Sequence, residues 1–328
     1  MRAPGCVPVA AEPVPQPAPR RWRKARVILN AAAGSKGGIP TNGKDPNELR
    51  ELLVRIGLGD DVATSSSVEE AKQLARDAVR RGSEVVVAAG GDGTIGTIAG
   101  ELLGTETALG ILPLGSIMNI PRMLGLPRDL EEAADVLATG VVRTVDVGEA
   151  NGRTFYEAGS VGMNAAMFRE AQRFDRGDYL SVLRTIWVAI RYRPARMQIE
   201  LDDRRLRTRA LMVTVSNGPY TGAGMTVAPD ARIDDGALDV CVFRHFSKLE
   251  LLTHLATIAF GRRKYSPHVR MYRSRRVRIT SATPLPCRAD SNDLGMTPVE
   301  FVTKPRALRV VVAADGDGDV PTDARRTA

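Results

Sequence analysis

The first part of the chain repeats one hydrophobic pattern, in which a short apolar run is followed by a segment with one apolar face. Three runs have the length and composition of buried strands, at residues 26–30, 84–89 and 108–112. Segments with helical periodicity occur at residues 45–56, 67–81, 94–103 and 129–138. The best defined of these helices starts at Ser67, which forms a capping box with Glu70, and ends at Gly82. Strands that alternate with helices predict a parallel, doubly wound α/β sheet.

The pattern changes near residue 141, where short strand-like segments replace the strand–helix repeat. Asn151-Gly152 stands between two of them and is a strong signal for a two-residue hairpin turn. Helical segments interrupt the strands at about 166–193 and at 248–261. Further strands are predicted at residues 196–203, 207–217, 236–243, 275–282, 299–305 and 307–314. This half is therefore expected to be antiparallel and β-rich, a sandwich-like second domain.

Both ends of the chain lack these patterns. Five prolines fall within the first 18 residues without a continuous apolar segment, so residues 1–23 are interpreted as a disordered, proline-rich lead and not as a signal peptide. Residues 314–328 are interpreted as a disordered tail. Between them we expect an α/β domain at 24–144 and a β-rich domain at 145–313. No apolar run reaches the ~18 residues of a transmembrane helix.

The net charge of +8 suits an anionic partner or substrate. Nucleic acid is not expected, because the basic runs contain few aromatic residues and no nucleic-acid-binding motif is present. The three cysteines, Cys6, Cys241 and Cys287, are too widely spaced for a disulfide framework or a metal site. They favour a reducing cytoplasm.

Residues 84–103, EVVVAAGGDGTIGTIAGELL, join a strand to a helix through a glycine-rich turn. The stretch 91–96 matches G-x-G-x-x-G, but it does not follow the first strand and no acidic residue lies near the end of the next one, which argues against dinucleotide binding. No Walker lysine follows the turn. Glycines let the backbone approach a ligand and the helix directs free N–H groups at an anion, so the turn is predicted to bind phosphate.

Asp92, in the middle of this turn, has two interpretations. Beside a phosphate its charge is repulsive unless a cation lies between them, so it is either a partner of a Mg²⁺–phosphate complex or a base for an acceptor hydroxyl. Alternatively, its carboxylate satisfies nearby backbone N–H groups as an ordinary turn and cap residue. The local chemistry leaves both interpretations open.

Five motifs, spread in order over residues 24–313, resemble those of the diacylglycerol kinase and sphingosine kinase superfamily. They are RVILNAAAG, GGDGT, GILPLGSIMNIPRMLGLP, SNGPYTGAGMTVAPDARIDDGALDV and TPVEFVTKPRALRVVV. NAD kinases share the GGDGT signature more distantly. The resemblance implies a doubly wound α/β nucleotide-binding domain joined to a β-rich domain. It also implies an enzyme that uses ATP and Mg²⁺ to phosphorylate a hydroxyl of a membrane lipid such as diacylglycerol.

The resemblance assigns roles to single residues. Ten of them are expected to bind or order the nucleotide and its phosphates: Asn30, Lys36, Thr64, Gly90, Gly91, Gly93, Thr94, Gly115, Ser116 and Asn119. Lys36 is equally explained as a solvated loop residue, and Asn119 as the partner of a local turn hydrogen bond. Asp92 and Asp290 are the expected catalytic carboxylates. Asp234 and Asp235 match a segment that holds Mg²⁺ in some members, and are equally explained as turn residues.

The chain departs from the family pattern at residues 290–292. Bacterial members place their base in an Asp-Gly-Glu segment, and here the segment is Asp290-Ser291-Asn292. Loss of a general base costs ~10²–10⁴ in rate, so a catalytically impaired regulator that binds lipid or nucleotide stays open. The sequence also leaves open a soluble NAD kinase-like enzyme and a dinucleotide oxidoreductase.

Two segments mix apolar, aromatic and basic residues, at 179–196 and 251–265. Each is either a helix that docks on an anionic bilayer or an amphipathic helix packed on the sheet. The expected location is the cytoplasm, with peripheral association at the inner face of the membrane where the lipid substrate is presented. The acceptor lipid and the oligomeric state, a homo-oligomer included, are left open by the sequence.

Overall fold

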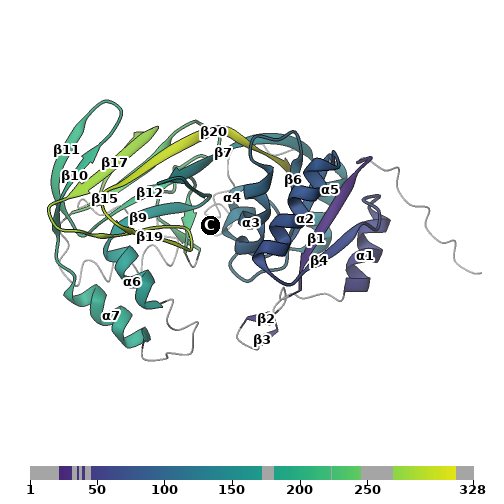
Figure 1. The fold of residues 1–328 in the computed structure, drawn as a ribbon, viewed down its shortest axis with the longest axis horizontal. Helices are drawn as coiled ribbons and strands as arrows, with labels where there is room; N and C mark the ends of the chain where they lie inside the picture. Colours follow the sequence, from purple (N-terminus) through teal and green to yellow (C-terminus); the bar gives the residue numbers. More distant parts are fainter. Residues whose placement is uncertain are drawn as a thin grey trace, which may run out of the picture.

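The computed structural model describes residues 22–31, 35–36, 39–40, 46–171, 181–222, 224–244 and 269–314. Most of the predicted lead and tail, the predicted helix at 248–261 and all three histidines lie outside these ranges. The described chain forms two parts, and the strands β7 (Val141–Ala150) and β20 (Val299–Val312) pass from one to the other (Figure 1). The predicted domain boundary at residues 144 and 145 falls within β7 and stays a prediction.

A parallel sheet in the order β4–β1–β5–β6 forms the centre of the first part. Its strands are β1 (Ala25–Asn30), β4 (Val62–Ser65), β5 (Val85–Gly90) and β6 (Ala108–Pro113). Two helices pack on each face: α1 (Pro46–Arg55) and α5 (Leu130–Thr139) on one, α2 (Val68–Arg80) and α3 (Asp92–Leu102) on the other. Every residue of β5 and β6 is therefore buried, and the predicted doubly wound arrangement is confirmed.

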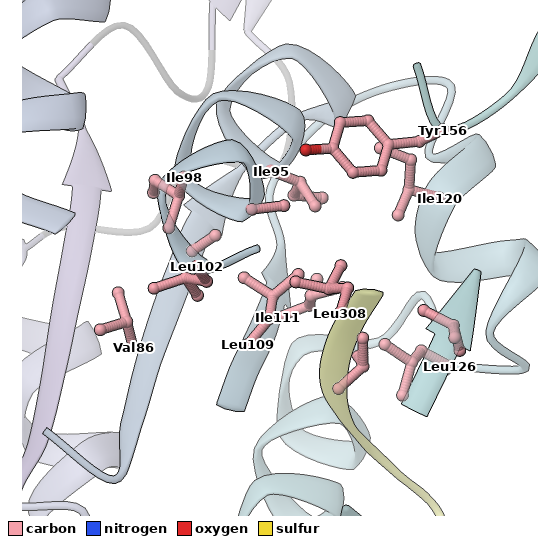
Figure 2. Packing of buried hydrophobic residues seen from close by; sticks show 14 of the residues in the cluster. Val86, Ile95, Ile98, Leu102, Leu109, Ile111, Ile120, Leu126, Tyr156 and Leu308 are labelled. Atoms are coloured by element: carbon pink, nitrogen blue, oxygen red, sulfur yellow. The ribbon is translucent and has the colours of Figure 1, made fainter. Parts of the chain in front are cut away.

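Figure 2 shows the core beneath α3. Side chains of α3 pack against those of β5 and β6, namely Ile95, Ile98, Leu102, Val86, Leu109 and Ile111. Tyr156 and Leu308, which fall in the predicted β-rich domain at 145–313, belong to the same cluster (Figure 2). The two parts thus share apolar packing, which holds the second part beside the helix that starts at the glycine turn.

The second part is a sandwich of two sheets. The parallel sheet continues through β20 into β17, β10 and β11, giving ten strands in all, and a six-stranded sheet faces this extension. The extension contains β8 (Arg153–Phe155), β10 (Ala195–Glu200), β11 (Arg205–Ala210) and β17 (Arg276–Ser281). The facing sheet contains β9 (Ala158–Gly162), β12 (Met212–Ser216), β15 (Leu238–Phe243), β16 (Val269–Ser274), β18 (Pro286–Ala289) and β19 (Asn292–Met296). The β-rich second domain is confirmed.

Smaller elements complete the described chain. α6 (Met163–Ala171) packs on β9 and β18 and is followed by α7 (Ser181–Arg191), so the predicted helical segment contains at least two helices (Figure 1). The short pieces are β2 (Ser35–Lys36), β3 (Ile39–Pro40), α4 (Asn119–Met123), β13 (Tyr220–Thr221) and β14 (Met225–Thr226).

The predicted hairpin turn is confirmed, whereas some of the predicted strands have other boundaries. Asn151 and Gly152 both have positive φ, 46° and 78°, and join β7 to β8 as a hairpin. The prediction of one strand at 207–217 is wrong, because Leu211 separates β11 from β12 in the opposite sheet. The two strands predicted at 299–305 and 307–314 are one strand, β20, whose pairing with β7 is irregular between Lys304 and Leu308. The alternation of apolar and polar residues indicates which side chains are buried, but it does not indicate which sheet a segment joins.

Candidate active site

The glycine turn lies at the carboxyl end of the parallel sheet, where the strand order reverses between β1 and β5. Gly91 is the extended N-cap residue of α3 and supplies no side-chain hydrogen bond to the helix. Asn30 is the last residue of β1, and its Nδ2 donates to Oγ1 of Thr94 in the first turn of α3 at 2.8 Å. The predicted residues of both segments are therefore brought together at a helix N-terminus, at the position where open α/β sheets bind ligands.

Close backbone approach explains two of the glycines. A Cβ at Gly90 would lie 2.7 Å from Cβ of Thr94, and a Cβ at Gly115 would lie 2.7 Å from Cα of Gly91. The first glycine turn and the second glycine loop thus pack directly on each other. Side chains at these positions would separate the loops and displace the start of α3.

Asp92 links the two loops by its carboxylate. Oδ2 accepts from the backbone N–H of Asn119 at 3.0 Å, and Oδ1 accepts from that of Ile120 at 2.9 Å. Those two groups start α4, so Asp92 caps a neighbouring helix. Asp92 therefore does cap a helix, as one of its two interpretations predicts, and its catalytic role stays a prediction.

Four other residues predicted to bind the nucleotide are either exposed or only partly described. Thr64 is exposed on β4, in register with Leu29 of β1. Gly93 and Ser116 are exposed in the two loops. Lys36 lies in β2, and its side chain is outside the part of the chain that the structure describes.

Asp290 lies in the tight turn between β18 and β19, with a positive φ of 46°. Its carboxylate accepts three backbone N–H groups, from Tyr156 at 2.7 Å, Glu157 at 3.0 Å and Ala158 at 3.1 Å. Burial raises the pKa of Asp290 to about 6, although these three hydrogen bonds and the charge of Arg288 act in the opposite direction. Asp290 therefore fixes the backbone of the 156–158 segment.

Glu157 is a site residue that the sequence patterns did not reveal. Its Oε2 accepts from Nδ2 of Asn119 at 2.9 Å and from the backbone N–H of Gly222 at 3.2 Å. Burial, followed by the charges of Asp290 and Asp92, raises the pKa of Glu157 to about 8. The only signal in the sequence was a single acid within an otherwise uncharged stretch, FYEAGSVGMNAAMF, and such a signal is weak.

One hydrogen-bonded chain connects the carboxylates of the two parts. It runs from Asp92 through the backbone and side chain of Asn119 to Glu157, and through the backbone N–H of Glu157 to Asp290. Asn119 is buried, and its Oδ1 has no hydrogen-bond partner in the described structure. Asn119 thus does more than order its own loop, because it joins the glycine loops to the second part.

The two acids predicted to hold Mg²⁺ make other contacts. Asp234 accepts from Nε of Arg232 at 3.2 Å, and Asp235 forms an ion pair with Arg273 and accepts from the backbone N–H of Ala237 at 3.0 Å. No group of three or more Asp, Glu, His or Cys among the described residues is arranged to hold a metal ion. The donor geometry gives no support to a magnesium site here, and the assignment remains a prediction.

Comparisons with known proteins match both parts of this architecture. Residues 24–150 match the Diacylglycerol kinase catalytic domain, and residues 158–312 match the YegS C-terminal NAD kinase beta sandwich-like domain. A protein of Chromohalobacter salexigens named "Probable lipid kinase YegS-like" is 34% identical over 65% of this chain and 73% of its own length. A diacylglycerol kinase of Bacillus subtilis is 26% identical over 88% of this chain and 96% of its own length.

A solved structure has the same fold. The crystal structure of a diacylglycerol kinase from Bacillus anthracis superposes with a TM-score of 0.69 at 19% identity, covering 89% of this chain and 97% of that one. The order of motifs, the two family matches and the similar relatives agree. This chain belongs to the diacylglycerol kinase and YegS-like family of lipid kinases.

Proposed function

We propose that this lipid kinase transfers the γ-phosphoryl group of ATP, taken up as its Mg²⁺ complex, to a hydroxyl of a membrane lipid such as diacylglycerol. The observation that carries the proposal is the N-terminus of α3, which has no side-chain cap and lies where the strand order of the sheet reverses. Its backbone N–H groups and helix dipole favour an anionic ligand. The carboxylate chain beside it supplies groups that can take up the proton of an acceptor hydroxyl.

The residues of the site have distinct tasks in this proposal. The glycine turn and Thr94 bind the phosphates through backbone N–H groups, and Asn30 holds the Thr94 hydroxyl in place. Asp92 keeps the second glycine loop against the first by capping α4. Mg²⁺ bound to ATP would offset the charge of the phosphates beside Asp92.

Phosphoryl transfer from γ-labelled ATP to a panel of lipids tests the function. We expect label in a lipid product with native protein, and a large loss with Asp92→Asn, which retains one oxygen to cap α4. Glu300→Gln is the control, because its side chain is 42% exposed and pairs with Arg276 on the neighbouring strand β17. Label in NAD and in no lipid would favour a soluble NAD kinase-like enzyme. ATP binding without any transfer would favour the impaired regulator.

The proposed membrane contact is the outer face of α7. Ile186, Trp187 and Ile190 are 52%, 59% and 44% exposed, and they are one, three and four positions apart on the helix. The guanidinium of Arg191 lies 4.7 Å from the centre of the Trp187 ring. An exposed apolar face with tryptophan and arginine suits the interface of an anionic bilayer, where the ring lies at the headgroups. The second segment with this composition, 251–265, is outside the described residues.

An arginine-lined groove begins where α7 ends. Three residues link α7 to β10, and a cavity of about 570 Å³ at the start of β10 is lined by Arg196, Arg207, Arg209 and Arg244 without any acidic residue. Arg196 lies directly opposite Arg209 in the β10–β11 pairing. Like charges at such positions destabilise a sheet unless an anion lies between them, so the groove is suited to lipid phosphate groups.

Vesicle co-sedimentation tests this contact, which we expect to be peripheral and at the cytoplasmic face of the membrane. Among the described residues no helix is long and apolar enough to cross a bilayer. Each arginine near an anionic surface contributes about 1 kcal/mol, so Arg196→Gln with Arg209→Gln should weaken binding to phosphatidylglycerol vesicles roughly 30-fold. Trp187→Ser should weaken it further, and Arg50→Gln on α1 is the matched control. Equal binding by all variants would refute the assigned surface.

A further inference from the structure

The transfer reaction needs a carboxylate oxygen that can accept a proton, and the three carboxylates of the site differ in this respect. Both oxygens of Asp92 accept N–H groups of α4. Both oxygens of Asp290 accept N–H groups of the 156–158 segment. Neither side chain can turn to a substrate without giving up hydrogen bonds that hold the loops together.

Glu157 differs, because only one of its carboxylate oxygens accepts hydrogen bonds from the described residues. Oε2 is held by Asn119 and Gly222, which fixes the side chain. Oε1 accepts no hydrogen bond from any described residue, and it is not among the polar atoms sealed from solvent. The side chain also lies on the chain of hydrogen bonds between the glycine loops and the second part, next to the phosphate-binding edge.

We infer that Glu157 is the general base of phosphoryl transfer, with Oε1 taking the proton of the acceptor hydroxyl. This inference rests on the proposed function. As the O–H bond breaks, the lipid oxygen forms a bond to the γ-phosphorus of ATP. The bond between that phosphorus and the β–γ bridging oxygen breaks, and its electron pair leaves with ADP. The proton on Glu157 is afterwards released to solvent.

The surroundings of Glu157 suit this role. Asp92 and Asp290 place negative charge near it, and the buried Arg288 guanidinium provides the nearby positive charge. Burial and the two acids bring the pKa of Glu157 to about 8, near the pH at which proton uptake and availability of the basic form are balanced. Asp290 then acts as a positioning residue, because it holds the backbone of Glu157 and raises its pKa.

A base at position 157 also explains how the chain tolerates asparagine at position 292. Asn292 is exposed at the start of β19, and among the described residues its side chain forms no hydrogen bond with Asp290 or Glu157. The carboxylate missing from the 290–292 segment is supplied from position 157, on the strand segment that Asp290 holds. We therefore expect Asn292→Glu to leave the rate of native protein unchanged within about twofold, since a base is already present.

The experiment compares pH profiles of lipid phosphorylation. Native kcat/KM should rise with pH, reach half of its maximum near pH 8 and level off above it. Glu157→Gln, which keeps the shape of the side chain, should lower kcat by ~10²–10⁴ and remove the rise. Asp290→Asn should shift the rise to lower pH, because it removes a negative charge that raises the pKa of Glu157. A purely structural role of Asp290 would not move this profile. Unchanged ATP affinity and a melting temperature at or above the native value exclude misfolding of Glu157→Gln, and Glu300→Gln is the matched control.

The outcomes separate the inference from the function. Lipid phosphorylation by Glu157→Gln at the native rate, with the native pH profile, overturns the inference and leaves the proposed function intact. Absence of transfer to any lipid by the native protein overturns both.

Discussion

Replacing Glu157 by glutamine should change how the stability of the protein depends on pH. The unfolded carboxyl ionises near pH 4.5, and the folded one ionises near pH 8 because it is buried beside two acids. Between these values the folded state holds a proton that the unfolded state has released. The free energy of unfolding therefore falls as pH rises, by about 1.4 kcal/mol for each pH unit.

The contribution of Glu157 to this fall in the free energy of unfolding is best measured between about pH 6.5 and pH 8. Burial raises the pKa of Asp290 and of Asp239 to about 6, so their titration largely precedes this window. Within the window Glu157 alone should lower the free energy of unfolding by roughly 1.5 kcal/mol, since half of the folded carboxyls are ionised at the upper limit. Glutamine cannot ionise, so the variant should lack this part of the decline.

Urea unfolding followed by circular dichroism measures the effect at each pH. The quantity of interest is the difference between native protein and Glu157→Gln, in which contributions from all other groups cancel to first order. A difference that grows in favour of the variant as pH rises supports the raised pKa. Parallel curves would refute it, and with it the electrostatic account of the site. The measurement needs no substrate and is independent of the proposed reaction.

Three further changes test other parts of the structure. Gly115→Ala should weaken ATP binding at least tenfold in calorimetry, because the new Cβ would lie 2.7 Å from Cα of Gly91, whereas Gly100→Ala, at 3.6 Å from its nearest contact, should not. Asp146→Ala should lower the free energy of unfolding by about 2–4 kcal/mol in urea titrations, because its buried carboxylate accepts two backbone N–H groups. Asp239→Asn should raise the melting temperature above pH 6 and have little effect below pH 4, because burial holds the pKa of this carboxyl near 6 and its Oδ2 lacks a partner among the described residues.

Neighbours in the sequence account for the local structure around the glycine turn. A buried strand that ends in glycine, an extended residue before the helix and a helix with an apolar face are all set by neighbours in the chain. The Asn151-Gly152 hairpin was equally predictable, because its backbone conformation depends on those two residues. Motif order then identified the family without any knowledge of contacts.

Which acids share one site, and whether each one holds a proton, depends on tertiary contacts. The contacts of Glu157 with Asn119 and Asp290 span 38 and 133 positions in the sequence, beyond the reach of any local pattern. The proton affinity of Glu157 depends on burial between two domains and on two distant charges, and neither appears in a linear pattern. The same limit explains why residues 207–217 were predicted as one strand: alternation records which side chains are buried, while the choice of sheet depends on partners that fold from elsewhere in the chain.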